Sequence, residues 1–326
     1  MISQHPVFAR AHTNIAVVKY WGKANEQIII PQSSSLSLTL KEFYTDTSAQ
    51  FVNGLSHDQI MINHHEVNES QKIKAVLALV RQLAGINTHV KINSVNHVPT
   101  SAGLASSASG LSALALASSY AAGLSLSRRN LSRLARHGSG SASRSIYGGW
   151  VEWQRGHDDK SSYAFPIKDP KLNDVDMIAV IIKKTPKKIS SRQGMRRSVK
   201  TSPYYQAWKR TTAHDLVAAV HAIQTNDFQT LGRVAETNAM RMHALTLSAD
   251  PPFTYFNGET IKAINLVNQM RANGIPCYYT IDAGPNVKIM CRHQDRLKIK
   301  DYLSKFFNAK NIVISGAGPG AHLIKK

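Results

Sequence analysis

The chain has 326 residues, 43% hydrophobic and 18% charged, and these globular proportions exclude a protein that is disordered throughout. Lys and Arg number 40 against 20 Asp and Glu, and the net charge of +20 predicts affinity for anions without saying which kind. No apolar run approaches the ~18 residues of a membrane span, so a globular protein of two lobes without a membrane segment is expected.

The first half of the chain mixes strand and helix patterns. Residues 14–19 have strand character, and the alternation of Leu and Ser/Thr over 36–40 predicts a half-exposed strand. Apolar residues from Ile73 to Leu83 recur at helical spacing, and Gly85 then suits a helix C-cap. A short strand is expected around Val90 and Ile92.

The second half is expected to be rich in helices. The continuous apolar run over 176–182 predicts a strand buried on both faces. The mixture predicts an α+β fold rather than a doubly wound sheet, with lobes at 1–185 and 186–326. Helical patterns occupy 211–224, 227–246 and 259–272, and short strands are expected in CYYTIDA, NVKIMC and NIVISG.

The two cysteines carry no metal or redox spacing. Cys277 and Cys291 are expected as buried thiols on neighbouring strands, which fits a reducing compartment. The N-terminal stretch lacks the apolar region of a signal peptide. A cytoplasmic location is therefore expected, and no metal site is predicted among the histidines.

Two glycine- and serine-rich segments are candidates for anion binding. PTSAGLASSASG, residues 99–110, leads into a helix of small residues, so its backbone amides, hydroxyls and the helix N-terminus form a phosphate cradle. It is not a Walker A loop, and the alternative is a flexible linker. The second segment, residues 137–153, places Arg144 after a donor-rich turn, where it could bind a carboxylate or phosphate. The alternative is an ordinary glycine turn before a strand.

Two further segments are rich in cations. VKYWGK, residues 18–23, holds two lysines around Tyr20 and Trp21, and its alternative is a solvated charged turn. Residues 183–200 carry eight Lys and Arg and no acid. A nucleic-acid-binding arm competes there with a mobile basic loop over phosphates, but no aromatic residue is present to stack on bases.

A single carboxylate stands out near the C-terminus. Asp282 follows an apolar strand in TIDAGPNV, so it is expected to be partly buried and to need a partner. The alternative is an Asp that caps a turn.

Six segments, in order, resemble one family. VKYWGK, NHVPTSAGLASSAS, GSGSASRSIYGGWVEW, SSRQGM, ETNAMRMHA and TIDAGPNV are similar to motifs of mevalonate diphosphate decarboxylases, a branch of the GHMP kinase superfamily. The likeness runs from about residue 10 to residue 320. It implies a GHMP-kinase-like two-lobed α+β fold with the active site in the cleft between the lobes.

The resemblance also implies roles for individual residues. It places Asp282 beside the substrate 3-hydroxyl with Lys19 next to it, and Arg144 opposite the substrate carboxylate. Ser191 completes the implied catalytic set and closes over the phosphates with Arg192. The residues implied to bind substrate are Tyr20, Trp21, Gly22, Lys23, Ser139, Gly140, Ser141, Ala142, Ser143, Arg144 and Arg192, and those implied for ATP are Ser94, Asn96, Gly103, Leu104, Ala105, Ser106 and Ser107.

The implied reaction consumes ATP with Mg²⁺. ATP phosphorylates the 3-hydroxyl of mevalonate 5-diphosphate, and loss of that phosphate with CO2 gives isopentenyl diphosphate. Asp282 either accepts the hydroxyl proton or stabilises developing positive charge, and the sequence leaves both roles open. A homodimer is expected, with neither a membrane nor a specific nucleic acid as partner. The alternatives are a relative that only phosphorylates mevalonate or its phosphates, and a nucleic-acid-binding protein without activity.

Overall fold

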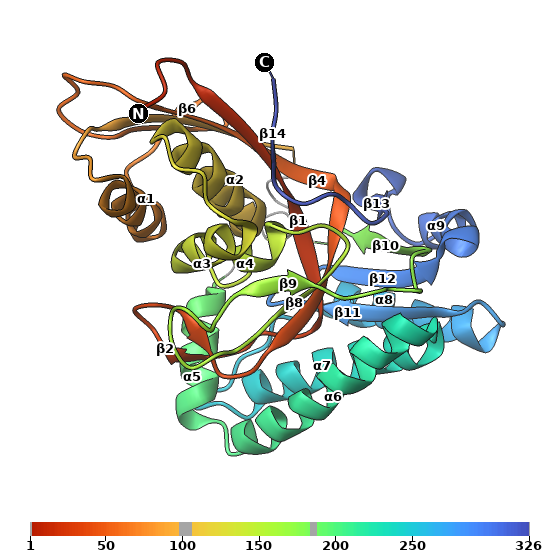
Figure 1. Ribbon diagram of the computed structural model, residues 1–326. Helices are drawn as coiled ribbons and strands as arrows, with labels where there is room; N and C mark the ends of the chain where they lie inside the picture. Colours follow the sequence, from red (N-terminus) through yellow and green to blue (C-terminus); the bar gives the residue numbers. More distant parts are fainter. Residues whose placement is uncertain (1, 98–105, 183–187, 326) are drawn as a thin grey trace.

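The larger of two main β-sheets is built mostly from the first half of the chain (Figure 1). The computed structural model describes residues 2–97, 106–182 and 188–325. The sheet has the order β14-β1-β4-β7-β5-β6, and β8 and β9 extend it from β4. Its strands are β1 (Val7–Val18), β4 (Ser35–Phe51), β5 (Gln59–Ile62), β6 (His65–Glu66), β7 (Val90–Asn96), β8 (Trp150–Trp153), β9 (Ala164–Pro166) and β14 (His322–Leu323), and a separate ribbon pairs β2 (Lys23–Asn25) with β3 (Ile30–Pro31).

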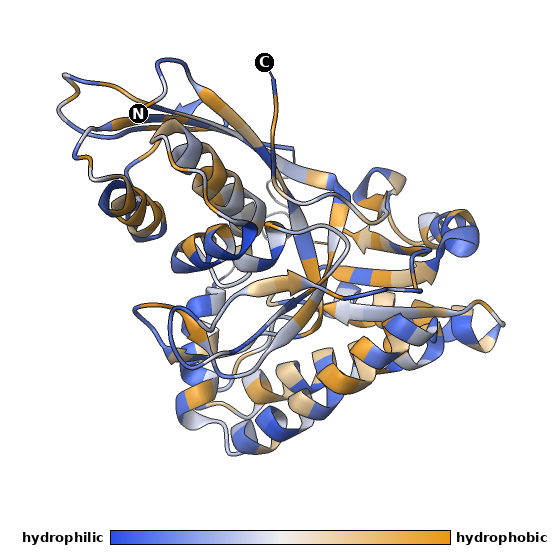
Figure 2. Ribbon diagram, in the orientation of Figure 1, coloured by the Kyte–Doolittle hydropathy of each residue, from blue (hydrophilic) through white to orange (hydrophobic). Residues whose placement is uncertain are grey.

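The smaller sheet is antiparallel, with the order β11-β12-β10-β13. Strands β10 and β12 carry mostly hydrophobic residues (Figure 2), because helices cover both faces of this sheet. Cys277 and Cys291 lie opposite each other on neighbouring strands as buried free thiols, as predicted. The strands are β10 (Val175–Val180), β11 (Cys277–Ile281), β12 (Val287–Arg292) and β13 (Ile312–Ser315), which confirms the predicted strands in this region.

The helices form layers on the two sheets (Figure 1). The helices within 106–145 contact the larger sheet and those within 228–304 contact the smaller one, while the two helices within 205–247 also pack on the larger sheet. This mixed architecture confirms the α+β class and the three predicted C-terminal helices, whereas the division at residue 185 stays a prediction. No helix of the described residues is long and apolar enough to cross a bilayer. The helices are α1 (Gln71–Ala84), α2 (Ser106–Ala121), α3 (Arg128–Gly138), α4 (Ala142–Ser145), α5 (Ser191–Thr201), α6 (Tyr205–Thr225), α7 (Phe228–Leu247), α8 (Gly258–Ala272) and α9 (Arg296–Ser304).

Strand β4 is buried on both faces, so the prediction of a half-exposed strand over 36–40 is wrong. Its leucines face the hydrophobic core that the larger sheet shares with α6 and α7. Its polar face is covered by α4, where Arg144 donates to Ser37 and Thr39 donates to the carbonyl of Tyr147. The alternating Leu and Ser/Thr residues of β4 therefore face the hydrophobic core on one side and α4 with Arg144 on the other, and neither side faces solvent.

Residues 191–201 form helix α5, so the expectation of a loop over 183–200 is wrong for this part. Ser190 caps the helix and Gln193 returns the bond in a capping box, which is the S-x-x-Q pattern of a helix start. Met195 and Val199 pack on the apolar cluster around Trp21. Residues 183–187 lie outside the described part of the chain.

Close packing between α7 and β11 generates a prediction about stability. A Cβ on Gly232 would lie 2.0 Å from the Tyr278 ring. Gly232→Ala should therefore lower the free energy of unfolding by about 1–3 kcal/mol, measured by urea denaturation. Gly258→Ala is the control, since nothing lies within 4 Å of its added Cβ and its backbone needs no glycine. Equal stability of the two variants would contradict this packing.

Candidate active site

A carboxylate held between two lysines lies where the strands of both sheets end. Lys19 directly follows β1, Asp282 directly follows β11, and Lys288 lies on β12. The Nζ of Lys19 is 2.8 Å from Oδ1 of Asp282, and the Nζ of Lys288 is 3.3 Å from Oδ2. The lysine side chains are 2% and 1% exposed, whereas that of Asp282 is 29% exposed. Only the carboxylate of this triad is therefore open to a ligand.

The lysines set the ionisation of the carboxylate. Burial by itself raises the pKa of Asp282, but Lys19 and then Lys288 outweigh it and hold that pKa well below its usual range. Burial lowers the pKa of Lys19 to about 8, although Asp282 opposes this. At neutral pH the Lys19–Asp282 pair is therefore an ion pair.

Arg144 is a buried cation with neutral partners. Its guanidinium donates to Asn14, Ser35 and Ser37 at 2.5–3.1 Å, and no acid of the described residues lies within salt-bridge distance. Burial lowers its pKa to about 10, so it stays charged at neutral pH, and the charge of Asp282 contributes to this pKa. A buried cation without a counter-ion is suited to binding an anion.

The structure brings the VKYWGK and GSGSAS segments together. Gly140 touches Trp153 and Tyr20 so closely that a Cβ would lie 2.6 Å from the first and 2.9 Å from the second. The hydroxyl of Tyr20 is buried without a partner among the described residues, so it is free to donate to a ligand. The hydroxyls of Ser139 and Ser141 lie 3.2 Å apart in the same turn.

Other predicted substrate residues lie behind this surface. Trp21 is buried and its carbonyl accepts from the Tyr205 hydroxyl at 2.7 Å. Gly22 has a φ of +112° and leaves no space for a Cβ beside Tyr205. Ala142 and Ser143 are fully buried, and their amides bond within the turn. The buried side chains of Trp21, Ala142 and Ser143 therefore support the surface of the site and are not part of it.

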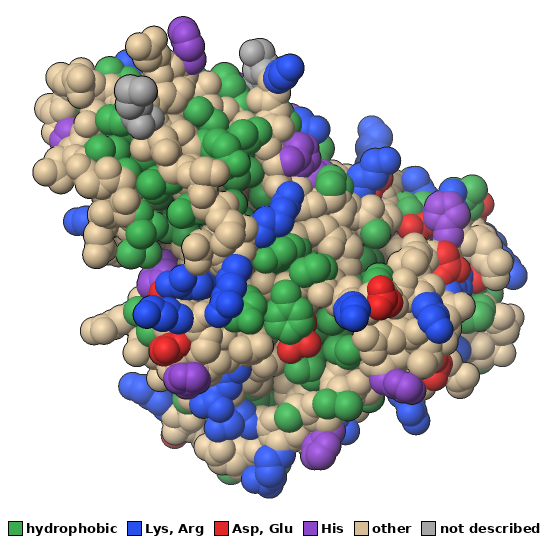
Figure 3. Space-filling view, viewed as in Figure 1, with side chains coloured by type: hydrophobic (Ala, Val, Ile, Leu, Met, Phe, Trp, Pro, Cys, Tyr) green, Lys and Arg blue, Asp and Glu red, His purple; other side chains and the backbone are tan. Residues whose placement is uncertain are grey.

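Arg192 lies within electrostatic range of Tyr20 and of two lysines from other elements. Burial and the nearby Arg192 lower the pKa values of Lys23 and Lys72, and Arg192 also influences Tyr20. Arg192 follows Ser191, which begins α5. Lys and Arg likewise far outnumber acids on the face shown in Figure 3. Such a cluster fits a phosphate or diphosphate.

The predicted nucleotide residues lie beside the start of α2. The hydroxyl of Ser94 pairs with Thr47 at 2.8 Å, and the Oδ1 of Asn96 accepts from Thr45 at 2.9 Å. Thr45 in turn pairs with Ser109 of α2 at 2.8 Å. Ser106 and Ser107 begin α2, and Gly103, Leu104 and Ala105 fall outside the described residues.

Sequence reasoning missed two of these cations. Lys288 is the lone charge among apolar neighbours in NVKIMC, and a cation buried in such a strand signals a nearby acid. Lys72 lies on the polar side of an ordinary amphipathic helix, where no sequence pattern distinguishes it from a solvated lysine.

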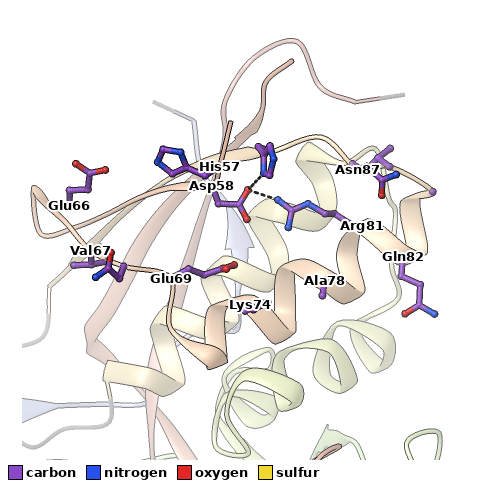
Figure 4. Close-up of a pocket in the computed structure, with 14 residues that line it drawn as sticks. His57, Asp58, Glu66, Val67, Glu69, Lys74, Ala78, Arg81, Gln82 and Asn87 are labelled. Atoms are coloured by element: carbon purple, nitrogen blue, oxygen red, sulfur yellow. Dashed lines mark hydrogen bonds and ion pairs between the residues drawn. The ribbon is translucent and has the colours of Figure 1, made fainter. Parts of the chain in front are cut away.

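A cavity of about 1140 Å³ lies away from the residues of the candidate active site, between α1 and the β5–β6 hairpin (Figure 4). At its edge the Asp58 carboxylate accepts from Arg81 at 2.5 Å and lies 3.2 Å from His89. The Asp58 carboxylate thus has its partners within the cavity lining. None of the predicted site residues lines it.

Comparisons with known proteins agree with this geometry. The family model of the diphosphomevalonate decarboxylase-like N-terminal domain matches residues 11–164, and that of the mevalonate 5-diphosphate decarboxylase C-terminal domain matches 177–318. The human diphosphomevalonate decarboxylase is 34% identical over 89% of this chain and 78% of its own length. The chain belongs to the diphosphomevalonate decarboxylase family.

Solved structures of the family extend over nearly the whole chain. Mevalonate diphosphate decarboxylase from Staphylococcus aureus is 46% identical, covers 98% of both chains and superposes with a TM-score of 0.95. The enzyme from Enterococcus faecalis is 48% identical, covers 98% of this chain and 99% of its own, and has a TM-score of 0.93. These similarities confirm the GHMP-kinase-like fold inferred from the motifs.

Helix α5 of this decarboxylase family member is tethered to the β2–β3 ribbon. Arg196 donates two bonds of 3.0 Å to Glu26, which also lies 3.4 Å from the Nζ of Lys23. Arg197 holds the other side by donating to the Pro251 carbonyl and stacking on Phe253. The tether therefore connects α5 with a cation of the candidate site.

Glu26→Gln should loosen α5 while changing global stability little. Exposed ion pairs contribute about 0.2–1 kcal/mol, so opening of α5 and its cleavage by trypsin should become up to about fivefold faster. The measurement is the rate of nicking within 191–201 by mass spectrometry. The control is Glu259→Gln, which removes an exposed pair with Lys262 on α8. Unchanged nicking in Glu26→Gln would show that the pair does not restrain the helix.

Proposed function

We propose that this chain catalyses the ATP-dependent decarboxylation of mevalonate 5-diphosphate to isopentenyl diphosphate, with release of ADP, phosphate and CO2. The observation that carries this proposal is the exposed edge of Asp282, ionised between two buried lysines and within electrostatic range of Arg144, whose hydrogen-bond partners in the described part of the chain are neutral. A solved relative, 49% identical with a TM-score of 0.94, is in complex with MVAPP, AMPPCP and magnesium. ATP and Mg²⁺ are therefore the proposed co-substrate and metal.

The low pKa of Asp282 bears on its role. A carboxylate held ionised by two ammonium groups is a weak proton acceptor, yet it still accepts a hydrogen bond and carries its charge throughout the reaction. We assign it to orienting the tertiary hydroxyl and to stabilising the positive charge that develops when the 3-phosphate leaves. Lys19 keeps it ionised and directs the carboxylate.

The cations around Asp282 are proposed to bind the anionic groups of the substrate. Arg144 is assigned to the carboxylate, because its neutral partners leave its charge uncompensated. Lys23, Lys72 and Arg192 are assigned to the diphosphate, with the Tyr20 hydroxyl and the 139–141 turn as donors. Ser191, at the start of α5, is proposed to close over the phosphates together with Arg192.

The nucleotide is proposed to bind along the start of α2. Ser94 and Asn96 are assigned to the adenine and residues 103–107 to the phosphates, which the helix N-terminus favours. No group of three His, Cys, Asp or Glu in the described part of the chain forms a metal cage. The donors present thus fit Mg²⁺ held mainly by phosphate oxygens, where it neutralises their charge.

Two features of assembly are also proposed. The lobes 1–185 and 186–326 would meet at the cleft that holds Asp282. The active form would be a cytoplasmic homodimer, since two-fold dimers are the commonest assemblies among soluble oligomers.

The decisive experiment incubates the protein with ATP, Mg²⁺ and mevalonate 5-diphosphate and follows ADP and CO2 together. Equal amounts of both are expected. Formation of ADP without CO2 would identify a kinase and overturn the decarboxylation, and formation of neither would overturn the function.

Asp282→Asn should abolish turnover while leaving substrate affinity nearly normal. The amide keeps the size but loses the charge, which costs about 10²–10⁴-fold in kcat. Steady-state kinetics, calorimetry with the substrate and circular dichroism measure the three quantities. A folded variant within tenfold of the wild-type kcat would remove Asp282 from the chemistry. Accumulation of a 3-phosphorylated intermediate would assign it to the elimination step.

The pH dependence of kcat should report Lys19. Its pKa is lowered to about 8, so its charge is present below that pH and is lost as the pH rises through it. We therefore expect kcat at saturating substrates to fall above about pH 8. In Lys19→Arg, any retained activity should persist to higher pH, since guanidinium stays protonated. A wild-type kcat that is constant to pH 10 would contradict this assignment.

A further inference from the structure

The backbone of Lys19 is held by a side chain from α7. Lys19 is the first residue beyond β1, so its amide has left the strand ladder and needs another partner. The N–H donates to Oδ1 of Asn238 at 2.7 Å, and Asn238 is fully buried in the middle of α7. This bond joins positions 219 residues apart and fixes where the Lys19 side chain begins.

A second contact fixes the orientation of the Asn238 amide. Its Nδ2 donates to Oδ2 of Asp215 at 2.9 Å, and Arg241 holds Asp215 through bonds of 3.0 and 3.1 Å. An amide turned the other way would set its oxygen against a carboxylate and its NH₂ against the Lys19 N–H. The network therefore permits one orientation, with the acceptor toward Lys19.

The same helix also holds the strand that carries Asp282. Glu236 accepts from the backbone N–H of Tyr279 at 3.1 Å, and Nε2 of His243 lies 3.4 Å from the carbonyl of Ile281. Burial lowers the pKa of His243 to about 3, so the ring is neutral, and its Nε2–H donates in the tautomer that bonds this carbonyl. Helix α7 is thus hydrogen-bonded both to the backbone of Lys19 and to the strand that leads into Asp282.

We propose that Asn238 is a positioning residue of the reaction, which sets the Lys19 ammonium at bonding distance from Asp282 through the Lys19 backbone. This rests on the proposed function of the Asp282 site. The ETNAMRMHA segment would then have a role that the sequence did not predict. One helix would fix the separation of Lys19 and Asp282, which come from opposite ends of the chain. Asn238 itself needs no contact with the substrate.

The test is Asn238→Leu, which keeps the volume and removes both hydrogen-bonding groups. Small displacements of a catalytic group cost up to about 100-fold, so kcat should fall by about 10- to 100-fold. The KM values for mevalonate 5-diphosphate and ATP should stay within about twofold, because the proposed substrate cations are not attached to α7. Thr246→Val is the control, since it removes from the same helix a buried hydroxyl that donates to the His243 carbonyl at 2.7 Å.

Asp215→Ala keeps the test valid if Asn238→Leu does not fold. Asp215 is 13% exposed, and its loss leaves the Asn238 Nδ2 with the longer, 3.4 Å contact to the Thr212 hydroxyl among the described residues. A severalfold loss of kcat with normal KM is expected. Because kcat is compared with wild type in one assay, an inactive wild type refutes the proposed function, whereas folded variants with normal kcat refute only the positioning role. A loss as large in Thr246→Val, or a rise in KM that matches the fall in kcat, would also overturn it.

Discussion

The arrangement depends on burying two ammonium groups around one carboxylate. Transfer of a charge into a protein interior is costly unless partners compensate it. Lys19 and Lys288 are almost completely buried, and within the described part of the chain Asp282 is the acid that lies between them. The triad therefore keeps an excess positive charge, which Arg144 increases. A site of this kind keeps its carboxylate ionised and remains attractive to further anions.

The fold supplies this triad by joining distant parts of the chain at strand ends. The residues following β1 and β11 meet there, although Lys19 and Asp282 are 263 positions apart. The core shared by the larger sheet, α6, α7 and the smaller sheet holds those strand ends together. The polar face of β4 completes the arrangement, because it carries the hydroxyls that receive Arg144. The apolar face stabilises the fold and the polar face presents the site.

Local sequence patterns predicted most helices and strands, and the family motifs predicted most of the charged residues of the candidate site. The helix ending at Gly85, the strands around Asp282 and the pairing of Lys19 with Asp282 follow from spacing or from resemblance. Helix α5 was missed because its polar sequence has little apolar periodicity, although its capping box was present. The burial of both faces of β4 and the bond from Lys19 to Asn238 depend on pairing across more than 100 and 200 residues, which one sequence does not reveal.

The buried cations have hydrogen-bond partners, but the one carboxylate that the two lysines share compensates only part of their charge. Lys19 donates to the carbonyl of Ala16, Lys288 to that of Asn286, and Arg144 to hydroxyls and an amide. Neutral acceptors fulfil hydrogen-bonding demand but leave most of the charge uncompensated. Had acids occupied these places, the cations would be as stable but would bind anions weakly, because a ligand would first have to displace a carboxylate. Glu26 shows the contrast, since it lies at the exposed rim beside Lys23 and Arg196. The interior thus keeps its positive charge for a ligand, whereas the rim uses an acid to tether a helix.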